Sequence, residues 1–264
     1  MPADRPGWLE GALVVSFQAL VLLGAGIVAG LVGSAGGITS LVSYPSLLAV
    51  GIPALAANVT NIVALVACWP GSAVASQPEL AGQGPWLRRW APIAALGGAA
   101  GSALLLSTPT GVFTRVVPVL VIAGSLALLA QPWLSSRRQQ HSSSGRRFGL
   151  PVGLFTLSVY NGYFGAGSGV LVLALVLLTT DPELPRANAL KNMLIGAASV
   201  VSAAAFALLG PVNWAAAGPL AVGMLIGSAF GPRVARRLPA AVLRWSIALL
   251  GVALAIQLWV KPGL

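Results

Sequence analysis

Long apolar runs, seldom interrupted by a charge, are the main pattern along this chain. Two of them, 11–77 and 148–180, contain no charged residue. Windows of about 20 apolar residues are long enough to cross a bilayer as helices, and these runs contain several. The pattern predicts an all-α integral membrane protein with about eight to ten apolar segments. We place them at 11–32, 37–50, 57–77, 90–108, 113–134, 148–164, 169–180, 188–209, 213–231 and 240–260.

Composition supports a membrane location, because only 8% of the 264 residues are charged and 57% are apolar. Soluble domains carry roughly 25% charged residues. Basic residues outnumber acidic ones by 15 to 5, but they lie mostly in short connectors, which is typical of membrane topology and not of a nucleic-acid groove. We therefore expect a multi-pass protein of the cell (inner, or cytoplasmic) membrane, surrounded by the lipid bilayer and without a nucleic-acid partner.

The basic residues also predict an orientation. We assume that the chain changes side at every segment and that the connector with Arg88 and Arg89 is cytoplasmic. The other cytoplasmic connectors are then 135–147, 181–187 and 232–239. The basic residues left outside are Arg5, Arg115 and Lys261. This distribution agrees with the positive-inside rule and places both termini outside the cytoplasm. The first segment is longer than a signal-peptide core, so we expect it to be retained.

An internal repeat divides the chain. GSAGG at 33–37 is followed by AANVTN at 56–61, and GAGSG at 165–169 is followed by RANALKN at 186–192. Five segments per half is an odd number, so the second half must enter the membrane from the opposite side, as in the inverted repeats of many transporters. Each repeat is expected to combine a short, broken or re-entrant helix pair with three spanning helices. The expected units are 1–134, a basic linker at 135–147 (SSRRQQHSSSGRR), and 148–264.

The segments that follow the glycine clusters are too short to cross the membrane. Segment 37–50 would span about 21 Å as a helix and 169–180 about 18 Å, against roughly 30 Å of hydrocarbon. Short, glycine-interrupted segments at matching positions point to a transport site, because irregular backbone at depth is tolerated where it lines a cavity. Free N–H groups at the start of each short helix would suit an anion. GSAGG does not fit a soluble phosphate-binding motif.

Helix packing is the alternative interpretation of these glycines. Both clusters are also GxxxG motifs, which allow helices to approach closely in membranes. Three further GxxxG motifs are Gly26–Gly30, Gly97–Gly101 and Gly227–Gly231.

The Asn motifs add polar side chains at membrane depth. Asn58 and Asn61 share one helix face, as do Asn188 and Asn192. Buried amides need partners, which a polar ligand or a neighbouring helix could supply. Lys191 lies within the second motif and should either attract an anion or reach the cytoplasmic surface by snorkelling.

These considerations define a candidate substrate site. Its residues are Gly33, Ser34, Gly36, Gly37, Asn58, Thr60, Asn61, Asn161, Gly165, Gly167, Ser168, Gly169, Asn188, Lys191 and Asn192.

Catalytic and metal-binding chemistry is not expected. The five acidic residues lie at segment ends or in connectors, His141 lies in the linker, and Cys68 is the single cysteine, which we expect to be a small buried apolar residue. The chain therefore offers neither a metal or cofactor site nor an enzyme's acid–base pair at depth. A proton relay through buried acids is equally unsupported. The membrane potential remains as a driving force, worth about 2.3 kcal/mol per charge per 100 mV.

At these motifs the sequence resembles the sulfite exporter TauE/SafE family of membrane permeases. The resemblance rests on GLVGSAGG, ANVTNIVAL, YNGYFGAGSG and ANALKNMLIGAASVVSAAAFALLGPVNW, and it extends from about Gly24 to Val260. It implies transport of small anions, often sulfur oxyanions or organosulfonates, usually outward. An anion channel, an importer and a non-transporting membrane scaffold remain alternatives, and a homo-oligomer is compatible with the sequence.

Overall fold

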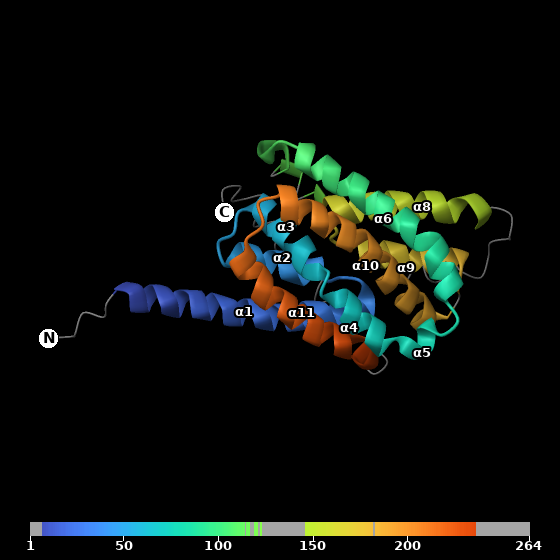
Figure 1. The fold of residues 1–264 in the computed structure, drawn as a ribbon, viewed down its shortest axis with the longest axis horizontal. Coiled ribbons are helices and arrows are strands. Elements are labelled where there is room, and N and C mark those ends of the chain that lie inside the picture. Colours follow the sequence, from blue (N-terminus) through green and yellow to red (C-terminus); the bar gives the residue numbers. More distant parts are fainter. Residues whose placement is uncertain are drawn as a thin grey trace.

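The computed structural model describes residues 7–113, 115–116, 119–120, 122, 146–181 and 183–235. Within these ranges the chain forms helices and no strand, which confirms the predicted all-α class. The segment at 240–260, nearly all of 113–134, most of the linker and both termini lie outside the described residues. With the labels of Figure 1, the helices are α1 (Gly7–Gly36), α2 (Ser40–Ala49), α3 (Ala54–Leu65), α4 (Cys68–Ala75), α5 (Gln77–Leu80), α6 (Gly84–Ser107), α8 (Arg146–Tyr163), α9 (Ser168–Thr179), α10 (Leu184–Leu209) and α11 (Trp214–Ala235).

Five helical stretches of the described chain are long and apolar enough to cross a membrane. They are Ser16–Gly36, Ala54–Ala75, Gly84–Ser107, Leu184–Leu209 and Trp214–Arg233. The apolar helices α2 and α9 have 10 and 12 residues, so they extend about 15 Å and 18 Å and cannot cross alone. This agrees with the two short helices predicted after the glycine clusters.

The predicted segment 57–77 corresponds to the spanning stretch Ala54–Ala75, although its helix is interrupted between α3 and α4. The N–H groups of Val66 and Ala67 bond to carbonyls three residues back, at 3.4 Å and 3.1 Å, which tightens the helix there. Pro70 has no N–H to bond the carbonyl of Val66. The two pieces therefore meet at a joint formed by Val66 and Ala67.

The first break is also shorter than the glycine cluster suggests. Helix α1 continues through Gly33 and ends at Gly36, so only residues 37–39 separate it from α2. Gly37 adopts a φ of 80°, in the left-handed region that glycine tolerates, and Gly165 adopts the same φ after α8. The two breaks therefore turn through similar backbone conformations.

Each half of the chain is packed against a helix from the other half. Helix α11 contacts α1 and α4, whereas α6 contacts α8 and α10. In Figure 1, α6 and α8 lie side by side along one edge of the molecule, and α1 lies along the opposite edge. The two halves are thus interlaced by this exchange of helices.

The GxxxG motifs outside the breaks lie at these contacts. A Cβ at Gly30 would come within 2.3 Å of the Met224 carbonyl oxygen, and one at Gly227 within 2.0 Å of the Ile27 carbonyl oxygen. In the other half, a Cβ at Gly101 would come within 2.1 Å of the Val159 carbonyl oxygen. Close backbone approach through small residues therefore holds α1 to α11 and α6 to α8.

Candidate transport site

The two glycine breaks meet, backbone against backbone. A Cβ at Gly37 would lie 2.4 Å from the carbonyl carbon of Gly169, and a Cβ at Gly169 would lie 2.4 Å from the Cα of Gly37. Real side chains do not approach this closely, so both positions require glycine. Nearby, the rings of Tyr44 in α2 and Phe164 after α8 pack edge to face with centroids 5.4 Å apart. Packing thus fixes the breaks against each other.

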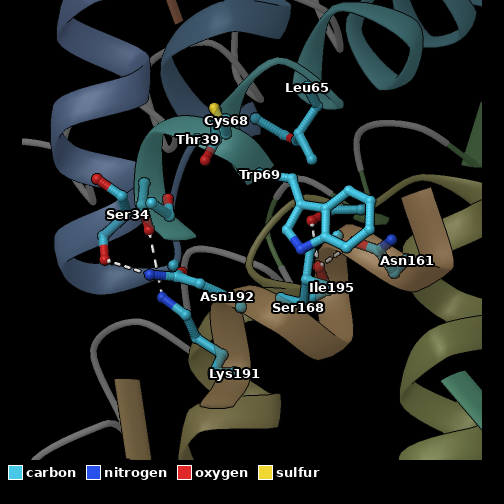
Figure 2. A pocket seen from close by; sticks show the side chains of 17 residues that line it. Ser34, Thr39, Leu65, Cys68, Trp69, Asn161, Ser168, Lys191, Asn192 and Ile195 are labelled. Carbon is cyan, nitrogen blue, oxygen red and sulfur yellow. Dashed lines mark hydrogen bonds between the residues drawn. The ribbon is translucent and has the colours of Figure 1, made fainter. Parts of the chain in front are cut away.

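A cavity of about 40 Å³ lies beside this contact (Figure 2). It has room for about three water molecules, or for a solute of similar size. Nine of the predicted residues line it, contributed by the two breaks and α10. They are Gly33, Ser34, Gly37, Asn161, Gly165, Ser168, Gly169, Lys191 and Asn192.

Lys191 supplies the cavity with a buried amine. Its side chain is 1% exposed, so it ends inside the protein instead of reaching the surface. Nζ donates a hydrogen bond to the Gly33 carbonyl oxygen at 3.3 Å (Figure 2). Among the described residues that line the cavity, none is acidic. Among these lining residues the lysine therefore meets no negatively charged side chain.

The carboxyl end of α1 receives two further donors from α10. Nδ2 of Asn188 and Nδ2 of Asn192 both donate to the Ser34 carbonyl oxygen, at 2.8 Å and 3.1 Å. The Ser34 carbonyl belongs to the last turn of α1, where a helix leaves its acceptors unpaired. One face of α10 thus supplies hydrogen-bond donors to the carboxyl end of α1.

Side chains also hold the second break in shape. Oγ of Ser168 lies 2.8 Å from two acceptors, Oδ1 of Asn161 and the Gly165 carbonyl oxygen, and its one hydrogen can serve either. Nδ2 of Asn161 donates to Oγ of Ser199 in α10 at 3.1 Å. Part of the hydrogen-bonding capacity of Asn161 and Ser168 is therefore used within the protein itself.

The Asn motif of the first half makes interhelical contacts. Nδ2 of Asn58 donates to the Tyr163 carbonyl oxygen at 2.9 Å, and Oγ1 of Thr60 accepts from the Asn213 N–H at 2.9 Å. Asn61 binds the hydroxyls of Ser40 and Ser43 in α2. The structure thus places Asn58, Thr60 and Asn61 away from the cavity walls, together with Gly36, Gly167 and Asn188.

Asn58 and Asn188 occupy corresponding places. Each donates to a backbone carbonyl at the end of the helix that precedes the other half's break, α8 for Asn58 and α1 for Asn188. Their Oδ1 atoms are buried and have no hydrogen-bond partner within the described ranges. The two halves are therefore tied together by a matching pair of amide hydrogen bonds.

The short helices begin with unused backbone donors. Neither α2 nor α9 has a side-chain hydrogen bond at its N-cap. Within the described chain, the N–H groups of Ser40 and Gly169 donate no hydrogen bond. Both residues line the cavity. The amino ends of two helices, each with a partial positive charge, thus border the same space.

Sequence reasoning missed Trp69, which forms one wall of the cavity (Figure 2). Its indole lies on Gly196 of α10, where a Cβ would come within 2.4 Å of Cδ1, and Nε1 lies 3.3 Å from Sδ of Met193. A signal was available, because Trp69 is one of two tryptophans away from segment ends. The other residues missed are Thr39, Ser40, Leu65, Cys68, Ser72, Ile195 and Gly196.

Comparison with known proteins identifies the family. The family model described as "Sulfite exporter TauE/SafE" matches residues 19–258. A curated relative from Haemophilus influenzae, described as "Probable membrane transporter protein", is 28% identical over 217 residues, covering 81% of this chain and 84% of the relative. No solved structure gives a significant match.

Proposed function

Since the chain belongs to the sulfite exporter TauE/SafE family of membrane transporters, we propose that it carries a small anion outward across the cell membrane. The substrate is a sulfite-like sulfur oxyanion or an organosulfonate, bound between the glycine breaks of the two repeats. The observation that carries this proposal is the cavity at that place, where buried Lys191 has no acidic neighbour among the described lining residues.

The polar groups around the cavity favour an anion over a cation. Lys191 can donate more than its one hydrogen bond to Gly33, and Asn192 and Ser168 bring further polar groups to the same space. The N–H groups at the start of α2 and α9 add two helix amino ends. A negatively charged solute would accept hydrogen bonds from these donors.

The orientation of the carrier follows from the repeats and from the basic connectors. We place the two halves as inverted repeats, a view supported by the matching breaks and by the exchange of α6 and α11. The positive-inside rule puts both termini outside the cytoplasm.

The membrane potential drives export in this proposal. Three acidic residues have side chains that the structure describes, Glu79, Asp181 and Glu183, and none of them lines the cavity. With the inside negative, each exported negative charge gains about 2.3 kcal/mol per 100 mV, a concentration ratio of roughly 40. The carrier then needs no coupled proton.

Flux of labelled sulfite, sulfate and small sulfonates in proteoliposomes tests the proposal. Flux should saturate with substrate and follow an imposed voltage, with and without a pH gradient. A strict requirement for the pH gradient at fixed voltage would contradict the driving force, and currents that never saturate would indicate a channel.

Binding is tested separately from transport. The same anions, carboxylates and inorganic cations are added to the purified protein, and thermal stabilisation is measured. Stabilisation by cations instead of anions would overturn the proposed site.

A further inference from the structure

We propose that Lys191 acts as a built-in cation at the carboxyl end of α1, in the position where carriers with broken helices hold a dissolved coupling cation. Helix carboxyl ends at such breaks coordinate Na⁺ or H⁺ in many secondary transporters. The consequence for transport rests on the proposed function, but the contacts between Lys191 and α1 do not depend on that function.

The acceptors at the end of α1 are arranged around the lysine. The Gly33 carbonyl oxygen accepts from Nζ of Lys191 and from the Gly37 N–H, at 3.3 Å and 2.6 Å. The Ser34 carbonyl oxygen accepts from the two α10 amides. A helix end of this kind carries a partial negative charge, which a cation stabilises.

Only the lysine can supply that charge. Asn188, Lys191 and Asn192 are spaced i, i+3 and i+4, so they project from one face of α10 toward the same turn of α1. The two amides are neutral donors. Nζ of Lys191 is the positive group, and its side chain is 1% exposed. The lysine thus combines the charge of a cation with a fixed tether to α10.

The other half of the chain lacks such a cation at the corresponding position. Asn58 occupies the place of Asn188, and the residue three positions later is Asn61, which corresponds to Lys191. Asn61 is neutral and binds the hydroxyls of Ser40 and Ser43. One built-in cation therefore serves the cavity that the two breaks share.

This arrangement determines which charge crosses the membrane. A dissolved cation would be released together with the substrate and would cancel part of its charge. A lysine stays with α10, so a monoanion crosses with its own charge. The carrier therefore needs no sodium, and its flux responds fully to voltage.

Chemical replacement of the lysine tests the inference. Lys191→Ala removes the charge and leaves space for a small cation, which methylammonium can fill. We expect methylammonium chloride at saturating concentration to raise the thermal midpoint of Lys191→Ala by about 4 °C. N-methylglucamine chloride at equal concentration should not do so, because this cation is too large. Lys191→Leu is the matched control, since its side chain fills the space and should prevent the rise.

A second control separates charge replacement from simple cavity filling. Leu65→Ala also enlarges the cavity but keeps Lys191, so methylammonium should leave its midpoint unchanged. An equal rise in Leu65→Ala, or no rise in Lys191→Ala, would overturn the inference. These thermal measurements do not depend on anion transport, so they can succeed or fail independently of the proposed function.

Wild-type flux provides a test that does not require any variant to fold. Replacing all sodium by N-methylglucamine should leave anion flux unchanged in the wild-type protein. Loss of flux without sodium would show that a dissolved cation is required and would contradict the role given to Lys191.

Discussion

The indole of Trp69 lies on the Cα of Gly196, at a distance that only a glycine in α10 permits. Trp69 is 38% exposed and also lines the cavity. The ring therefore extends from the cavity to the outer surface of the described structure. Its polar anchor is the contact of Nε1 with Sδ of Met193 at 3.3 Å, which is a weak bond because sulfur is a poor acceptor.

We expect Trp69→Ala to open the cavity to water-soluble reagents. The neighbouring Cys68 is the only cysteine of the chain and also lines the cavity, so its rate of modification by a negatively charged thiol reagent reports access. The rate should rise roughly tenfold. This corresponds to lowering the free-energy cost of opening a path to Cys68 by about 1.4 kcal/mol. Cys68→Ser provides the blank, and an unchanged rate would mean that the ring does not limit access.

The contact between the breaks predicts strong effects at two glycines. Gly37→Ala combines a disfavoured φ of 80° with a clash against Gly169, and Gly169→Ala produces the clash alone. We expect a loss of about 2–4 kcal/mol for Gly37→Ala and about 1–3 kcal/mol for Gly169→Ala. Thermal unfolding of the purified proteins measures both. Gly24→Ala is the control, because a Cβ there meets nothing within 4 Å, and it should not lower the midpoint.

Charge reversal at Lys191 should stop transport without preventing insertion. Lys191→Glu places a negative charge at the cavity that we propose binds an anion, so flux should fall to background. Lys191→Gln keeps a donor but loses the charge and should raise the half-saturation concentration by about tenfold, equivalent to about 1.4 kcal/mol. Membrane fractionation confirms insertion. Normal flux in both variants would leave the lysine without a role in substrate binding.

The two matching asparagines should differ in their contribution to stability. The Tyr163 carbonyl oxygen has Asn58 as its one hydrogen-bond donor in the described chain, whereas the Ser34 carbonyl oxygen keeps Asn192 when Asn188 is removed. Asn58→Ala should therefore cost about 1–3 kcal/mol, since it leaves the partly buried Tyr163 carbonyl without a donor. Asn188→Ala should cost less. A lower thermal midpoint for Asn188→Ala than for Asn58→Ala would contradict this assignment of hydrogen-bond donors.

The sequence predicts the short helices and the glycine breaks because their signals are local. A segment of ten or twelve apolar residues is visibly too short to span, whatever surrounds it. Lys191 stands out for a similar reason, because a basic residue at that depth requires an explanation. Its partner could not be predicted, since Gly33 lies 158 positions away and no periodicity connects the two.

The joint between α3 and α4 shows a second limit. Pro70 is visible in the sequence, but prolines at 45, 92, 151 and 219 lie inside helices that continue past them. Neighbouring helices and local bonds can satisfy the freed carbonyl groups in a membrane protein. Whether a proline divides a helix therefore depends on its surroundings and not on its presence.

The exchange of α6 and α11 restricts how this carrier can expose its substrate. If one half swung away from the other as a rigid block, α1 would separate from α11 and α8 from α6, along seams where not even a methyl group fits between the backbones. Such seams favour sliding over parting. In the proposed carrier we therefore expect alternating exposure to involve smaller pieces inside the frame, among them α4 with Trp69, which follows the tightened stretch at Val66 and Ala67.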